Sequence, residues 1–183
     1  ETFEAGGGEI LFVSHSADPS EAVQKTNDYM TAYGDTDCIY ATGEDYITPA
    51  ADVIKSRGIT DCKIYGSNIS PSVCQLIMDG QVEACTGGEF VCGSLAVTLL
   101  INYLDGNPIK DADGTAPYFD NLTQFMVTAE NAEDFYEFLS DENLATHTIS
   151  DEEYQNLLVR NNPDVDYDYF YDFLTNYEEH VYA

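Results

Sequence analysis

The chain has 183 residues and a formal net charge of −28, from 34 acidic and 6 basic residues. Proteins that bind nucleic acids or anionic membrane surfaces use Lys and Arg to do so, and this charge therefore excludes both kinds of partner. Hydrophobic residues make up 44% of the chain and aromatic residues 13%, a composition that indicates an ordered domain rather than a disordered acidic tail.

The sequence shows neither a membrane span nor a secretion signal. No apolar run reaches the roughly 18–20 residues that cross a bilayer. The first nine residues are acidic and rich in glycine, unlike a signal peptide. We expect that the chain was nevertheless secreted if processing took place before Glu1.

The five cysteines leave two interpretations open. No C-x-x-C pair occurs, which argues against a zinc or thioredoxin-like site. Cys38 and Cys62 each follow an aspartate at the start of an expected strand, so they could meet in a disulfide if those strands were neighbours. The favoured interpretation is that they are small, buried apolar residues.

Short apolar runs alternate with helical patterns along most of the chain. We expect residues 1–8 to form a flexible N-terminal segment. The continuous apolar run Glu9–Ser14 predicts a strand buried on both faces. Further strands are expected at 38–42, 62–66, 82–86 and 122–128, and helices at 19–33, 45–57, 70–80, 90–104 and 129–139. This alternation predicts βαβ units around a parallel sheet, with right-handed crossovers.

The expected helix Phe90–Leu104 is apolar nearly all round, and its main polar breaks are Ser94, Thr98 and Asn102. A helix of this kind must be buried. Exposing a large apolar side chain costs about 1.5 kcal/mol or more. We therefore expect the helix to pack on the chain's own sheet or on a second copy, in a homodimer.

Residues 140–183 form an acidic, aromatic extension, with helices expected at 150–160 and 163–177. Aspartates alternate between residues 164 and 168, as they do in a calcium loop. The Gly and Glu that an EF-hand needs at its sixth and twelfth positions are Tyr169 and Thr175 here, which favours a solvated acidic face instead. We expect no metal site and no cofactor.

Five segments are similar, in order and spacing, to motifs of one protein family. They are Asp35–Thr42 (similar to hPDIDAVFA), Lys63–Pro71 (VVGFDGTP), Ile77–Ala84 (IKDGKLDAT), Gly93–Gly106 (G-x-x-A-V-x-x-A-x-x-x-L-x-G) and Phe125–Asn131 (LVTxEN). Together they resemble the C-terminal lobe of type I periplasmic (solute-binding) proteins, the ribose- and galactose-binding class.

The resemblance implies an α/β fold, a three-layer Rossmann-like lobe with a parallel sheet, over residues 9–139. Residues 140–183 would then be a helical C-terminal extension. The family's N-terminal lobe would lie upstream of Glu1, so we expect the chain to be a truncated or proteolysed piece rather than a natural half.

Ligands of open parallel sheets bind beyond the carboxyl ends of the strands. This rule selects five candidate ligand-binding residues in the expected loops, namely Ser16, Thr42, Glu44, Asn68 and Glu89. Short polar side chains and carboxylates of this kind suit the hydroxyls of a sugar or polyol, or a cation.

The resemblance supports these candidates unevenly. Asn68 stands where the family usually has a ligand-binding Asp. Gly43 and Glu44 stand where an Asn-Asp pair is usual, and the usual Gln is absent around Gly87 and Gly88. Two of the three expected contacts have therefore changed, which weakens the case for a simple pentose or hexose as the ligand.

The resemblance implies the extracytoplasmic solute-binding component of an ABC importer, either periplasmic or lipid-anchored at a bacterial cell surface. Its partners would be a small polar, sugar-like ligand and an ABC permease. The alternative is a ligand-sensing or protein-interaction domain of a signalling receptor with the same fold. We do not expect an enzyme, because Ser14 and His15 would point to opposite faces of a strand and no nucleophile or phosphate-loop motif occurs.

Overall fold

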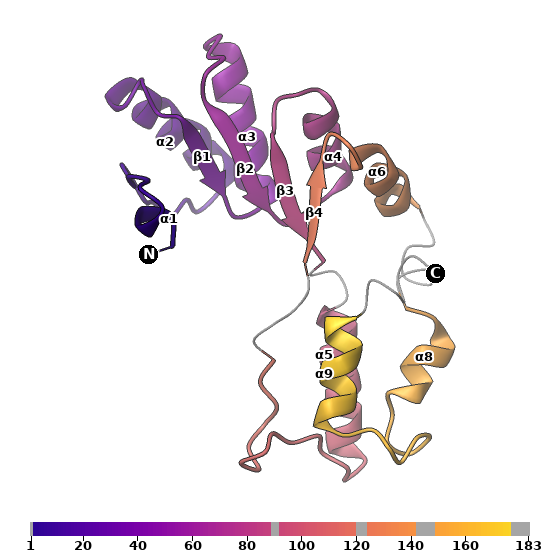
Figure 1. The fold of residues 1–183 in the computed structure, drawn as a ribbon. Helices are drawn as coiled ribbons and strands as arrows, with labels where there is room; N and C mark the ends of the chain where they lie inside the picture. The colour runs from indigo at the N-terminus through magenta and orange to yellow at the C-terminus, as the bar shows by residue number, and fades with distance from the viewer. Residues whose placement is uncertain (1, 89–91, 120–123, 142–148, 177–183) are drawn as a thin grey trace. The chain divides into compact units, whose positions relative to one another are not determined.

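The computed structural model describes residues 2–88, 92–119, 124–141 and 149–176 (Figure 1). The chain divides into two compact units. The first contains Glu1–Thr86 and Met126–Glu137, and the second contains Gly87–Phe125 and Phe138–Ala183.

The first unit is built on a four-stranded sheet of order β1-β2-β3-β4. The strands are β1 (Cys38–Ala41), β2 (Lys63–Ser67), β3 (Ala84–Gly87) and β4 (Phe125–Thr128). The first three pair in parallel, with Tyr40 opposite Tyr65 and Tyr65 opposite Ala84. Figure 1 shows β4 running in the opposite direction beside β3. The predicted α/β class with a largely parallel sheet is confirmed.

Local sequence signals set the helices of this unit. The helices are α1 (Thr2–Ala5), α2 (Pro19–Ala32), α3 (Glu44–Ser56), α4 (Pro71–Met78) and α6 (Ala132–Ser140). The Asp18 side chain caps α2 by accepting from the Glu21 N–H, and the Ser70 hydroxyl caps α4 in the same way. A proline follows each cap, where its missing N–H is harmless.

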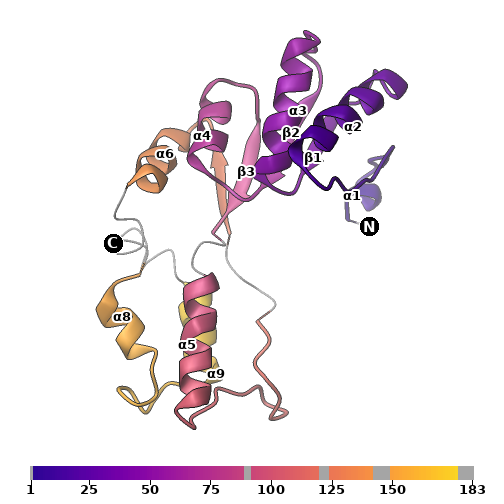
Figure 2. The same cartoon turned by 180° about the vertical axis from the view of Figure 1, so that it is seen from behind.

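The helices α2, α3 and α4 lie on one face of the sheet, behind it in Figure 1 and in front of it in Figure 2. Ile64 of β2 is buried on this face with Ile47 of α3. The opposite face carries large exposed side chains: Tyr40 is 62% exposed, its register partner Tyr65 38%, and Met126 57%. One face of the sheet therefore holds the core, and the other is bare among the described residues.

The expectation of a buried strand at Glu9–Ser14 is wrong. These residues have no regular structure, and Ile10, Leu11, Phe12 and Val13 are 39–73% exposed. The ring of Phe12 lies 3.9 Å from that of Tyr29 on α2, centroid to centroid. No described backbone hydrogen bond joins the run to β1. A strand-forming composition cannot make a strand without a neighbouring backbone to pair with.

Cys38 and Cys62 both carry free thiols, and Cys62 is buried, as the apolar interpretation predicts. Burial raises the pKa of Cys62 from 9.0 to about 11, with smaller contributions from Cys38 and Asp37. Burial likewise raises the pKa of Cys74 to about 11.

These shifts predict a loss of stability in alkali. Between pH 9 and 11 the thiols of Cys62 and Cys74 ionise in the unfolded chain but stay protonated in the folded one. The unfolded state then binds fewer protons, so the free energy of unfolding falls as the pH rises. We expect the urea midpoint to fall more steeply over this range in the parent chain than in a C62A/C74A variant. Equal slopes would contradict the assignment.

The described part of the second unit contains the helices α5 (Cys92–Leu104), α8 (Asp151–Asn156) and α9 (Tyr167–Thr175), joined by irregular segments such as residues 105–119. Ser150 and Glu153 form a reciprocal capping box at the start of α8. Asp166 caps α9 by accepting from the Tyr169 N–H, which gives one of the alternating aspartates a local role. No helix in the described ranges is long and apolar enough to cross a membrane.

The burial pattern of α5 differs from the expected one. Its buried residues are Leu95, Thr98 and Asn102, so two of its polar residues face inward. Its exposed apolar residues are Val97 (55%), Leu100 (53%), Tyr103 (65%) and Leu104 (72%). Asn102 donates a hydrogen bond to the Leu157 carbonyl and accepts one from the Val159 N–H, so the buried side of α5 faces the chain after α8 within the second unit. We had expected this helix to pack on the sheet or on a second copy. The pairing of α5 with a second copy stays a prediction.

Candidate ligand site at the carboxyl edge of the sheet

Three of the five predicted ligand residues lie along one edge of the first unit. Because β1 and β2 run in parallel, their carboxyl ends lie at the same edge of the sheet (Figure 1). Thr42 directly follows β1, Glu44 is the first residue of α3, and Asn68 directly follows β2. Thr42 and Asn68 are exposed and Glu44 is half-buried. The parallel sheet thus brings together residues that are up to 26 positions apart in the chain.

A hydrogen bond that the sequence did not predict links a fourth predicted ligand residue, Ser16, to the start of α3. The Tyr46 hydroxyl, in the first turn of α3, donates to the carbonyl oxygen of Ser16 at 3.0 Å. The Lys25 ammonium also donates to the carbonyl of His15, which holds the same loop. Tyr46 therefore fixes Ser16 beside the start of α3. The only feature of the sequence that could have indicated this contact is the aromatic side chain of Tyr46.

The first turn of α3 offers backbone donors at this edge. Its cap is Gly43, which has no side chain to accept a hydrogen bond. The N–H groups of Tyr46 and Ile47 both bond to the Gly43 carbonyl at 2.9 Å. Those of Glu44 and Asp45 have no partner in the described part of the chain, as expected for uncapped first-turn donors. Because both residues also carry carboxylates, a neutral hydroxyl suits this turn better than an anion does.

Asn68 has an unusual backbone. Its φ of 75° makes it the only non-glycine residue with a positive φ in the described chain. Asparagine tolerates this left-handed conformation better than most residues. The Asn68 side chain is exposed and has no hydrogen-bond partner among the described residues, so its amide can both donate and accept. Strained loop residues of this kind often occur at functional sites.

Gly88, with a φ of 126°, follows β3, is buried and belongs to the second unit. Glu89, the fifth predicted ligand residue, lies outside the described residues. Within the described ranges, no group of three His, Cys, Asp or Glu residues could hold a metal ion.

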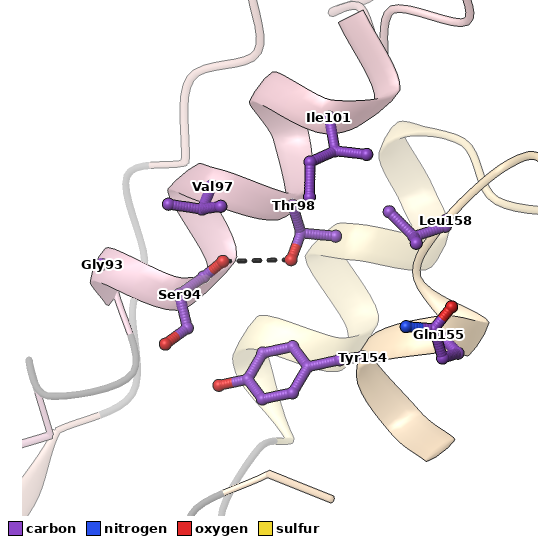
Figure 3. Close-up of a pocket in the computed structure, with 8 residues that line it drawn as sticks. All are labelled: Gly93, Ser94, Val97, Thr98, Ile101, Tyr154, Gln155 and Leu158. Carbon is purple, nitrogen blue, oxygen red and sulfur yellow. Dashed lines mark hydrogen bonds between the residues drawn. The ribbon is translucent and has the colours of Figure 1, made fainter. Parts of the chain in front are cut away.

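The second unit contains a separate open pocket of about 490 Å³ between α5 and α8 (Figure 3). Its lining residues are Gly93, Ser94, Val97, Thr98, Ile101, Tyr154, Gln155 and Leu158. The Thr98 hydroxyl donates to the carbonyl of Ser94 at 3.0 Å, so its proton is already engaged. The pocket contains no predicted ligand residue, and no charged residue lines it.

Residues 1–108 match the family of the periplasmic binding protein domain. The chain belongs to this family. The resemblance to type I periplasmic solute-binding proteins is therefore confirmed, and the matched region includes every predicted ligand residue. No curated protein matches the sequence significantly.

Solved structures of similar fold include periplasmic proteins and sugar-binding proteins. A periplasmic sugar-binding protein from Pseudomonas fluorescens superposes with a TM-score of 0.65 at 17% identity, covering 83% of this chain and 45% of that one. A galactofuranose binding protein gives 0.60 at 18% identity, covering 75% and 47%. A periplasmic ribose ABC transporter protein from Conexibacter woesei gives 0.57 at 17% identity, covering 74% and 45%. The chain thus spans less than half the length of each of these neighbours.

Proposed function

We propose that this periplasmic binding protein domain acts outside the cytoplasm as part of a solute-binding protein that delivers a small, neutral, polyhydroxylated ligand to an ABC permease. The family match over residues 1–108 carries the proposal. The carboxyl edge supports it with unpaired backbone donors at α3 and the unpartnered amide of Asn68. The role is binding, with no reaction step assigned to any residue.

Because the chain spans less than half of its neighbours' length, it would supply one side of a ligand site between two lobes. Closure of two lobes favours the bound state through contacts that each lobe makes. One lobe alone makes only part of those contacts, so we expect weak binding, with a Kd of about 1 mM or above (about −4 kcal/mol).

A sugar titration tests the assignment. With D-ribose or D-galactose added to the ¹⁵N-labelled chain, we expect amide shifts confined to Thr42, Glu44 and Asn68. The N68G variant keeps the backbone conformation but loses the amide, and should lose most of the shift. The N68D variant keeps an acceptor and should retain the shift. Shifts confined to the α5–α8 pocket, or submicromolar binding, would contradict the proposal.

A second candidate is a sensing or protein-interaction domain of a receptor with the same fold. The bare sheet face with Tyr40 and Tyr65 favours it, because exposed aromatic residues are enriched at protein interfaces. Genes for a permease and an ATPase beside this one would support import. A kinase or chemoreceptor segment on the same chain would support sensing.

A further inference from the structure

The loop His15–Asp18 is held against α2 and α3 by side-chain hydrogen bonds, although it belongs to no helix or strand. Each of its four residues takes part in one such bond: Lys25 donates to the His15 carbonyl, Tyr46 to the Ser16 carbonyl at 3.0 Å, the Ala17 N–H to Glu21 at 2.5 Å, and the Glu21 N–H to Asp18 at 2.9 Å. The path of this loop is therefore fixed at every residue.

Of these four bonds, only that of Tyr46 connects the loop to the carboxyl edge of the sheet. The other three involve α2, which begins directly after the loop, whereas Tyr46 is 30 residues from Ser16 along the chain. The Tyr46 ring also lies against Gly43, where a Cβ atom would be 3.7 Å from it. The side chain of Tyr46 thus joins the loop to the turn Thr42–Glu44, which contains two predicted ligand residues.

The hydroxyl of Ser16 is the group on this loop that suits a ligand. Ser16 is half-buried, and its hydroxyl forms no hydrogen bond with any described residue, so it can both donate and accept. The bond from Tyr46 uses the Ser16 carbonyl and leaves this hydroxyl available. A group that is already held in place before binding loses less conformational entropy when the ligand arrives, which raises the affinity.

We propose that Tyr46 is a positioning residue of the ligand site, which holds the Ser16 hydroxyl where it bonds a hydroxyl group of a polyhydroxylated ligand. This inference rests on the proposed function and adds a second wall to the site, opposite in sequence to Asn68. Tyr46 acts through Ser16, because its own hydroxyl proton is engaged by the loop. The conserved geometry needed is one hydrogen bond, so a single oxygen atom decides the effect.

A double-mutant cycle tests the proposal in the ¹⁵N-labelled full chain. D-ribose or D-galactose is titrated in, and the Kd is taken from the shift of the Asn68 amide. The Y46F variant keeps the ring but loses the hydroxyl, and S16A loses the hydroxyl but keeps the carbonyl that Tyr46 binds. Each should weaken binding about three- to tenfold, the effect of one hydrogen bond. Because Tyr46 acts through Ser16, the Y46F/S16A variant should bind about as well as S16A alone.

The matched control is Y33F, at the far end of α2, where the lost hydroxyl has no described hydrogen bond, and its Kd should equal that of the parent.

Several outcomes would overturn the proposal, and they separate it from the proposed function. If neither sugar shifts the Asn68 amide of the parent chain, the proposed function fails and this inference fails with it. If the parent binds and Y46F binds equally well, only the positioning role fails. Losses that multiply in Y46F/S16A would show that Tyr46 does not act through Ser16. Hydrogen exchange at Val53, in the buried part of α3, should be unchanged in Y46F, and faster exchange there would make Tyr46 a purely structural residue.

Discussion

Replacing Gly66 with alanine is expected to lower the free energy of unfolding of the first unit by about 2 kcal/mol, since overfilling a packed core typically costs 1–3 kcal/mol. A Cβ atom at this position in β2 would lie 2.4 Å from Cδ1 and 2.8 Å from Cγ1 of Ile47. It would also lie 3.0 Å from the carbonyl oxygen of Ala41. Ile47 is fully buried and Ala41 belongs to the neighbouring strand, so neither atom can move without disturbing the core.

Two further variants make this test specific. A Cβ atom at Gly43 would meet only the Tyr46 ring, at 3.7 Å, so G43A should cost well under 1 kcal/mol. Shortening the neighbour in G66A/I47V should recover part of the loss, because the two side chains compete for one space. Urea unfolding followed by circular dichroism measures all three variants. A G66A midpoint equal to that of G43A would show that β2 and α3 are not packed this closely.

The second large effect is expected at Asn102, which is completely buried in α5. Its amide donates to the Leu157 carbonyl at 2.9 Å and accepts from the Val159 N–H at 2.9 Å. The N102A variant would leave the buried Leu157 carbonyl and the half-buried Val159 N–H without this partner, and a buried group left unsatisfied costs about 1–3 kcal/mol. We expect the second unit to lose about 3 kcal/mol of stability.

Hydrogen exchange resolved by residue distinguishes this effect from a general loss of stability. In N102A the amides of Leu95 and Phe170 should exchange faster by about a hundredfold, the equivalent of roughly 3 kcal/mol. The matched control is L104A, on the same helix at a side chain that is 72% exposed, and it should change exchange little. Equal acceleration in both variants would show that the Asn102 bridge does not hold this unit together.

Asn102 shows why the helix Phe90–Leu104 could be predicted but its packing could not. Its length and composition indicated a helix, and its apolar character indicated burial. The side that is buried instead contains Thr98 and Asn102, because the chain after α8 offers a backbone N–H and C=O that an amide can bridge. A pattern of apolar residues indicates what should be covered, but it does not reveal a hydrogen-bonding partner 55 residues away.

The candidate ligand site, too, could be predicted from the sequence only in part. The strand-and-loop pattern was enough to place Thr42, Glu44 and Asn68 at one edge, because parallel strands end at the same side. The contact from Tyr46 to Ser16 and the positive φ of Asn68 could not be predicted, since each depends on the final path of a loop.

The sequence by itself determined the α/β class, the family and most of the helices and strands. These follow from local signals: apolar runs of strand length, and caps such as Ser70 before Pro71, whose bonds form within a few residues. Only the tertiary structure decided which apolar segments are covered. Glu9–Ser14 has the composition of a buried strand, yet it lies exposed outside the sheet. A strand is completed by the backbone of its neighbour, and local sequence does not specify whether that neighbour is present.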